Sequence, residues 1–193
     1  MKNALVRIWK GKQTLETFSL EDHQVVKIGG GIISGMVDNQ PLKMKYQVTL
    51  DEDFQVQSVK IEIPGRAKSF LLLNLDQFGR WFNESNQHLP ELDGCLDIDI
   101  SVTPFTNTLA IKRLGMRGKE MEQLNVVYIK VPELNISRVL QEYSKISATH
   151  YHFNDLHSGF QSELWVDEDS MVTSFANHFE MVYRKETTGT GFY

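Results

Sequence analysis

Alternation of apolar and polar residues recurs along most of the chain and predicts β-strands. In the clearest run, residues 96–102, aliphatic side chains alternate with Asp97, Asp99 and Ser101. Successive side chains of a strand point to opposite faces, so a period of two is typical of a strand buried on one face. Further strand-like runs, alternating or continuously apolar, are found at residues 4–9, 14–20, 25–28, 43–50, 54–63, 69–75, 125–131, 149–153, 160–166, 171–175 and 179–183. About a dozen short strands at close spacing indicate an antiparallel barrel or roll.

One stretch near the middle of the chain, about residues 103–114, predicts a helix. Thr103 can cap it through the side-chain hydroxyl, and Pro104 suits the first helical position, where no N–H is needed. Lys112 and Arg113 lie in the last turn, where cations favour the negative end of the helix dipole. Gly115 favours termination, because glycine accepts the left-handed conformation that closes helices.

The apolar residues of this helix do not form one stripe, because Phe105 and Leu109 share a face while Ile111 points elsewhere. A helix that is apolar on several sides is usually surrounded, so we expect a curved sheet to enclose it. Such a sheet has a natural interior for an apolar guest. The polar residues of an enclosed helix need partners, and they are Thr106, Asn107, Thr108, Lys112 and Arg113. Either they bond to neighbouring backbone and carboxylates, or they line a ligand cavity.

Two segments carry patterns that compete with this interpretation. In residues 134–147 the apolar positions follow helical spacing, which predicts a second helix. The glycine run at residues 29–31 resembles a phosphate-binding loop. The dinucleotide fingerprint fails, however, because Ser34 stands where the third glycine should be. We therefore expect these glycines to mark a bulge or a backbone that packs close to another group.

Composition narrows the class of protein. The chain has 193 residues and a net charge of −5. We expect one domain over residues 1–185 and a disordered tail over 186–193. Without a basic block, a nucleic-acid role has little electrostatic support. The single cysteine, Cys95, excludes an internal disulfide and fits a reducing compartment. No stretch approaches the roughly 20 apolar residues of a membrane span, so we expect a cytoplasmic protein.

Few residues suggest chemistry. His150 and His152 would share a strand face near Asp155 and His157, as a metal site could use, but half-buried side chains in a sheet explain them more simply. Asp97 and Asp99 also share a face, where they could act as acid and base, line a solvated surface, or pair with Lys112 and Arg113. Cys95 lacks a recognisable triad, since nothing places His88 as its base. The G-x-S-x-G motif of serine hydrolases is absent. We therefore expect no catalytic residue, no metal and no cofactor.

A long central motif resembles a known family. Residues 92–100, Leu-Asp-Gly-Cys-Leu-Asp-Ile-Asp-Ile, run into Thr-Pro-Phe-Thr-Asn-Thr-Leu at 103–109 and Lys-Arg-Leu at 112–114. This sequence is similar to the signature of the bacterial glycolipid-binding family, first catalogued as a domain of unknown function. Weaker matches flank it at Trp9, Tyr46–Leu50, Gly79-Arg80-Trp81, Gln141-x-Tyr143 and Phe160–Asp167.

The resemblance implies a mainly β fold, with one many-stranded antiparallel sheet wrapped as a spiral roll or half-barrel around a single helix, often as a homodimer. It also implies likeness to lipoprotein carriers, which hold acyl chains in a half-open sheet. A single-helix fold would make residues 134–147 a strand, and we favour that assignment. Ala110 stands where the family usually has proline, so a straighter and longer helix is expected here.

Three functions are consistent with the sequence. The first is a non-enzymatic binding protein for an amphipathic lipid or glycolipid, with the acyl chain against Phe105, Leu109 and Ile111. The head group would then meet Thr106, Asn107, Lys112 and Arg113. The second is a small hydrolase or isomerase acting on a lipid or sugar through Asp97, Asp99, Arg113 or the histidines. The third is a structural protein with a filled core. We favour the first.

Overall fold

Fourteen strands form one continuous sheet in the structure, a computed structural model that describes residues 3–116, 118 and 120–187. The strands are β1 (Asn3–Gly11), β2 (Thr14–Asp22), β3 (Val26–Val37), β4 (Gln40–Asp51), β5 (Val56–Glu62), β6 (Phe70–Leu75), β7 (Trp81–Asn83), β8 (Asp97–Ile100), β9 (Met121–Lys130), β10 (Asn135–Ser147), β11 (His150–Asp155), β12 (Phe160–Val166), β13 (Val172–Phe175) and β14 (Phe179–Thr187). One α-helix, α1 (Phe105–Met116), and one 3-10 turn, η1 (Pro90–Leu92), complete the described elements. The predicted fold class, a mainly β sheet around one helix, is confirmed.

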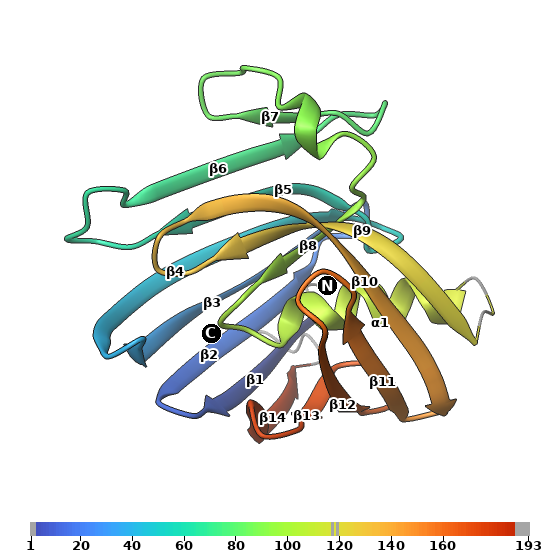
Figure 1. Ribbon diagram of the computed structural model, residues 1–193. Helices are drawn as coiled ribbons and strands as arrows, with labels where there is room; N and C mark the ends of the chain where they lie inside the picture. The colour runs from blue at the N-terminus through green and yellow to red at the C-terminus, as the bar shows by residue number, and fades with distance from the viewer. Residues whose placement is uncertain (1–2, 117, 119, 188–193) are drawn as a thin grey trace.

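The N-terminal and C-terminal strands lie side by side in the middle of the sheet. Strand β1 pairs with both β2 and β14, so the first and last strands are neighbours and the spatial order is β7 to β1 followed by β14 to β8. Every pairing is antiparallel except that of β8 with β9, which flank α1 in sequence. The sheet therefore ends at β7 and β8 and does not close. It curls so that β1–β3 and β9–β12 lie on opposite sides of α1 (Figure 1).

Four hairpin turns share one local device. The side-chain oxygen of Asp51, Asp76, Asn83 or Asp167 accepts hydrogen bonds from the backbone N–H groups two and four residues later. The residue three positions after each has a positive φ angle, between 57° and 76°. Asp and Asn favour such turns because their short side chains bond to nearby backbone. These connections are thus encoded by adjacent residues.

Strand β10 replaces the second helix that apolar spacing predicts over residues 134–147. Its residues 135–144 pair with β9, and its residues 141–147 pair with β11. Its buried positions alternate as Val139, Gln141 and Tyr143, which is the period of a strand. The pattern was concealed because the middle buried residue is polar, while the apolar Ile146 is exposed. The strand assignment implied by the family resemblance is correct.

The helix begins and ends close to its expected bounds. Its first N–H, that of Phe105, donates to the Thr103 hydroxyl at 3.1 Å. It continues through Ala110 and past Gly115 to Met116, so Gly115 does not terminate it. Of the disordered tail expected over 186–193, Glu186 and Thr187 belong to β14 instead, and residues 188–193 lie outside the described part of the chain.

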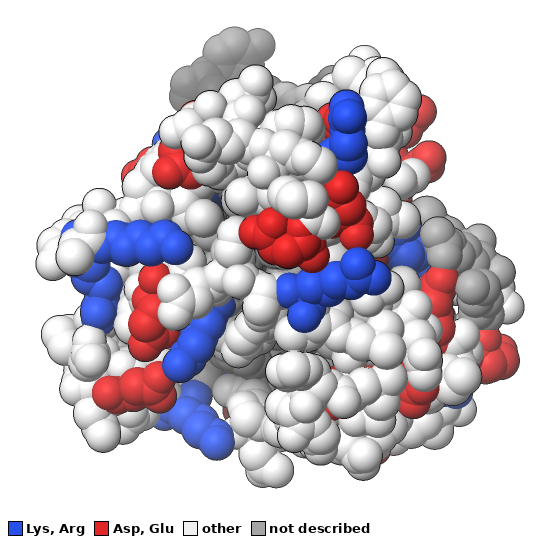
Figure 2. All heavy atoms as spheres, turned by 45° about the horizontal axis from the view of Figure 1, so that its top comes forward, with Lys and Arg blue, Asp and Glu red and all other residues white. Residues whose placement is uncertain are grey.

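The glycine run of β3 serves close packing. A Cβ atom at Gly29 would lie 2.6 Å from Cζ of Phe105, and one at Gly30 would lie 2.5 Å from the Tyr46 carbonyl oxygen. The strand is thereby able to approach both the helix and β4. On the face shown in Figure 2, basic and acidic side chains are interspersed and do not gather into a patch of one sign.

Candidate functional site

A partly open cavity of about 430 Å³ lies beside the first turn of α1. Its lining comes from β8, α1, β9, β10, the β11–β12 hairpin and the β13–β14 hairpin, so it is assembled by segments that are far apart in sequence. Asn107 is the helix residue in this lining. The volume falls in the range of about 300–1,000 Å³ that is usual for small-molecule pockets.

One wall of the cavity is aromatic. Its residues are Phe153 from β11, Phe160 from β12, Phe175 from β13, His178 from the following turn and Phe179 from β14. The rings of Phe153 and Phe175 meet edge to face at 5.7 Å, and Phe160 meets His178 at 5.0 Å. Phe153 and Phe175 are buried, whereas Phe160 is 38% exposed. This wall offers apolar surface that reaches from the interior to the solvent.

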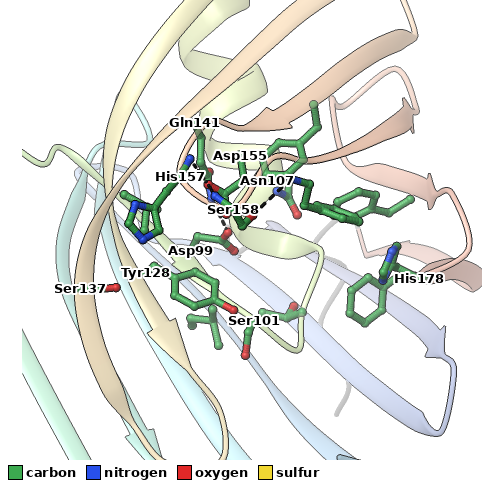
Figure 3. Close-up of a pocket in the computed structure, with 17 residues that line it drawn as sticks. Asp99, Ser101, Asn107, Tyr128, Ser137, Gln141, Asp155, His157, Ser158 and His178 are labelled. Carbon is green, nitrogen blue, oxygen red and sulfur yellow. Dashed lines mark hydrogen bonds between the residues drawn. The ribbon is translucent and has the colours of Figure 1, made fainter.

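The opposite part of the cavity is polar and connected by hydrogen bonds. Gln141 Nε2 donates to Asp99 Oδ2 at 2.6 Å, and the Thr106 hydroxyl donates to Asp99 Oδ1 at 3.3 Å. Tyr143 donates its hydroxyl to Gln141 Oε1 at 3.2 Å and accepts from Asn107 Nδ2 at 2.9 Å. Figure 3 shows Asp99, Asn107 and Gln141 converging from a strand edge, the helix and a second strand. A network in which each group has partners holds these side chains in fixed orientations.

Burial changes the acidity of groups around the cavity. Desolvation raises the pKa of Asp99, although the bonds from Gln141 and Thr106 oppose this shift. Desolvation also raises the pKa of Tyr128 and lowers that of His178. Removing water therefore disfavours the charged form of all three side chains.

The rim is set by a turn. Asp155 Oδ1 accepts from the N–H groups of His157 and Ser158, and Oδ2 accepts from the Ser158 hydroxyl. His157 and Ser158 are exposed at this rim, as is Ser137 of β10. His157 and Asp155, which stand together in sequence, thus both line the cavity.

The helix residues assigned to ligand binding are distributed over several places. Phe105 packs against Phe18 at a ring distance of 4.4 Å, and Leu109 and Ile111 are 1% exposed within the hydrophobic core. None of these three lines the cavity of about 430 Å³. Thr106 bonds beneath it to Asp99 and to the Ile100 N–H, and Asn107 alone of the seven enters its lining.

Lys112 points to the other side of the molecule. Its Nζ donates to the Asp169 carbonyl oxygen at 2.6 Å and lies 4.4 Å from the ring centroid of Phe54. Burial lowers its pKa. It borders a smaller cavity of about 240 Å³ together with Lys27 and Glu186.

Asp97 and Asp99 have separate partners. Arg113 donates through Nε to Asp97 Oδ2 at 2.7 Å and through one terminal nitrogen to Asp97 Oδ1 at 3.0 Å. Asp99 bonds to Gln141 and Thr106 and not to Lys112. The hypothesis that both aspartates line a solvated face is wrong, because Asp97 is 1% exposed and Asp99 is held in the cavity. The helix covers the strand face on which they were expected to meet water.

The remaining candidates form other contacts. His150 and His152 share a face, as expected, and both bond to Glu163, at 2.6 and 2.9 Å. Within residues 3–116, 118 and 120–187, no group of three His, Cys, Asp or Glu side chains is arranged to hold a metal ion. Cys95 is buried, which raises its pKa to about 11, and His88 bonds to Asp93 instead.

Sequence reasoning missed the cavity because its lining does not form a motif. Gln141, Tyr128 and the phenylalanines come from six strands, and their proximity depends on how the sheet curls. The one available signal was a glutamine between two apolar residues at strand spacing, Val139 and Tyr143. It was hidden by the apparent helical period.

Comparisons with known proteins agree with the architecture. A family model described as “Putative glycolipid-binding” matches residues 7–181. The crystal structure of a DUF1089 family protein from Pseudomonas aeruginosa, PA1994, superposes with a TM-score of 0.75 at 27% identity, covering 89% of this chain and 93% of that one. A beta-barrel-like DUF1849 protein from Brucella abortus superposes with a TM-score of 0.56 at 8% identity, over 97% and 98% of the two chains, and shares the fold.

No curated protein matches the sequence. Among the described residues, α1 is too short and too polar to span a bilayer, and no other helix qualifies. The family match covers most of the chain, and the solved structure from Pseudomonas aeruginosa is similar over nearly its whole length. The chain therefore belongs to the family described as “Putative glycolipid-binding”.

Proposed function

We propose that this protein binds an amphipathic molecule of the glycolipid class without transforming it, and that the ligand occupies the cavity between Asp99, Gln141 and the aromatic wall. The observation that carries the proposal is the two-sided lining: four phenylalanines face a hydrogen-bonded set of carboxylate, amide and hydroxyl groups. Family membership supports the ligand class.

The two sides of the cavity match the two parts of such a ligand. Burying an acyl chain on apolar surface stabilises the complex by about 0.8 kcal/mol per methylene before ordering costs. The polar network supplies oriented groups for the other end. Both oxygens of Asp99 are already held by neighbouring side chains, which suits a fixed binding group. We therefore propose the cavity as the binding site, in place of the core-facing helix residues that the sequence suggested.

A steric block provides the test. Ser137 is exposed and lines the cavity, so Ser137→Trp should fill it without disturbing the core. Ser34 is an exposed strand serine in β3, outside this lining, and Ser34→Trp is the matched control. We would purify all three proteins without detergent and measure bound mass by native mass spectrometry, followed by solvent extraction.

The expected result is a lipid-sized mass on the wild type and on Ser34→Trp, reduced at least about tenfold on Ser137→Trp, since a filled cavity excludes the ligand. An apo preparation would then be titrated with short-chain amphiphiles that differ in head group. The proposal fails if no amphiphile of any head group binds, or if Ser137→Trp binds as well as the control.

A further inference from the structure

We propose that the cavity selects an uncharged, hydroxyl-bearing head group and discriminates against anionic ones, with Asp99, Asn107 and Gln141 as the groups that read it. This inference rests on the proposed function, because it concerns the same cavity. It adds the charge of the head group, the residues that distinguish it from an ion, and the orientation of the ligand.

The charge of the lining argues against an anion. Among the described residues that line the cavity there are two carboxylates, Asp99 and Asp155, two histidines, His157 and His178, and neither lysine nor arginine. Burial lowers the pKa of His178, which favours its neutral form. Arg113, in the last turn of the helix, bonds to Asp97. Like charges in close contact repel, and the repulsion is stronger in a partly buried site than in water. A phosphate, sulfate or carboxylate head group would meet this repulsion without a lysine or arginine in the lining to offset it.

The hydrogen-bonding groups fit a hydroxylated ligand. Each Asp99 oxygen accepts one bond within the protein, and a carboxylate oxygen has a second lone pair. The amides of Asn107 and Gln141 both donate and accept, and so do the hydroxyls of Ser101 and Tyr128 in the lining. A ligand hydroxyl also does both. It can donate to the carboxylate while it accepts from an amide.

A quaternary ammonium is the other ligand that suits aromatic faces and carboxylates. A quaternary ammonium forms no hydrogen bonds, so it would cover the amides of Asn107 and Gln141 and give them no hydrogen bond in place of those they make with solvent. A buried polar group that is left without a hydrogen-bond partner destabilises the complex. The number of amide and hydroxyl groups therefore favours the neutral polyol over the cation.

Depth sets the orientation of the ligand. Asn107 and Gln141 are 3% and 1% exposed, whereas Phe160 lies at the surface, with the exposed Leu156 nearby in sequence. In Figure 3 the labelled polar groups Asp99, Asn107 and Gln141 lie together, and His178 lies on the far side of the cavity. The hydroxylated ring would enter first and rest its apolar face on the phenylalanine wall. The acyl chain would leave across Phe160.

The experiment compares three probes with one hexyl chain: hexyl β-D-glucoside, hexyl sulfate and hexyltrimethylammonium. Their affinities would be measured by calorimetry at neutral pH on the full chain. We expect the glucoside to bind at least about tenfold tighter than either ion, because a site built for hydroxyl groups rejects ligands that lack them. Equal or tighter binding of the sulfate overturns the inference, and so does tightest binding of the ammonium probe.

Two substitutions test the role of charge. Asp99→Asn should weaken glucoside binding and strengthen sulfate binding, each by about tenfold, because one carboxylate is gone. Asp155→Asn retains the turn-capping oxygen and should strengthen sulfate binding as well, which keeps the test valid if Asp99→Asn does not fold. Asp53→Asn, in an exposed turn outside this lining, is the control and should change neither affinity.

The outcomes separate the two proposals. Binding of several hexyl probes in an order other than the one expected, or sulfate affinity unchanged in both variants, overturns the head-group inference and leaves the binding function intact. Failure of all probes, together with a clean apo mass in the steric-block experiment, overturns the binding function itself.

Discussion

A buried acid lies beneath the start of the helix. Glu16 is 2% exposed, and its Oε1 accepts a 2.5 Å hydrogen bond from the Tyr46 hydroxyl. The Tyr46 oxygen contacts the Thr103 hydroxyl at 3.2 Å, which in turn accepts from the Phe105 N–H. A chain of hydrogen bonds thus connects the helix cap to Glu16. The second carboxylate oxygen of Glu16, Oε2, is buried without a hydrogen-bond partner in the described structure.

This arrangement predicts that Glu16 makes stability depend on pH. Burial raises the pKa of Glu16 from 4.5 to about 7, so the folded protein holds this proton more tightly than the unfolded chain. The resulting stabilisation is complete below pH 4.5 and is lost as the pH rises to about 7. Glu16→Gln should match the wild type near pH 4.5 and exceed its free energy of unfolding above pH 7, by on the order of 3 kcal/mol.

Urea unfolding at several pH values measures this difference. Glu84→Gln removes one exposed carboxylate and serves as the control for net charge. Other titrating groups are common to all three proteins and cancel in the comparison. If Glu16→Gln and the wild type kept a constant difference between pH 4.5 and 8, Glu16 would not be the group responsible.

At the scale of elements, the approach of β3 to α1 depends on a missing side chain. The ring of Phe105 occupies the space that a Cβ of Gly29 would need. Glycine weakens a strand on its own, so its value here lies in the close contact that it permits. Phe105 also packs on Phe18, and the helix start is thereby fixed against β2 and β3.

Gly29→Ala should therefore destabilise the fold by about 1–3 kcal/mol, since overpacking forces neighbouring atoms to shift. The cost should fall in a Phe105→Leu background, where the ring is absent. Gly115→Ala is the control, because a Cβ there meets nothing within 4 Å and alanine favours a helix by up to about 1 kcal/mol. Thermal denaturation of the single and double variants gives the coupling energy, and strict additivity would rule out the proposed contact.

At the scale of the whole molecule, the helix joins two hydrophobic clusters. Phe105 and Leu109 belong to the larger cluster, whose strand residues come from β1–β9, whereas Ile111 and Leu114 belong to the cluster under β9–β13. The β1–β14 pairing connects the two halves of the sheet at its centre. Two halves that share a helix and a continuous ladder are expected to unfold together.

Leu109→Ala should consequently lower the stability of both halves equally, by about 2–5 kcal/mol. Hydrogen exchange in increasing urea would measure this loss of stability, with amides of β4 and β10 as reporters of the two halves. In the wild type the amides of β4 and β10 should exchange with the same opening free energy at high urea. Leu15→Ala, at a residue that is 51% exposed, controls for loss of an exposed leucine. A change confined to β4 would mean that the halves unfold independently.

Local features were readable from adjacent residues. The Thr103-Pro104 start of the helix, most strands and the aspartate-capped turns depend on contacts within a few positions, so their residue types carry the information. Apolar spacing predicted the wrong type of element where a polar residue took a buried position. Gln141 did so in β10, and its partner Asp99 is supplied by a strand 42 residues earlier.

Strand alternation and one capped helix were therefore enough to indicate a mainly β fold, and the motif over residues 92–114 was enough to indicate the family. Arg113 bonds to Asp97, a pairing that the sequence suggested, but the sequence did not show that Lys112 lies on the other side of the molecule. Nor did it show that the phenylalanines of β11–β14 form one wall of a cavity, because no local pattern contains that wall. The physical reason is that a buried polar group is stabilised by partners distant in sequence, and these are brought together only when the sheet curls around the helix.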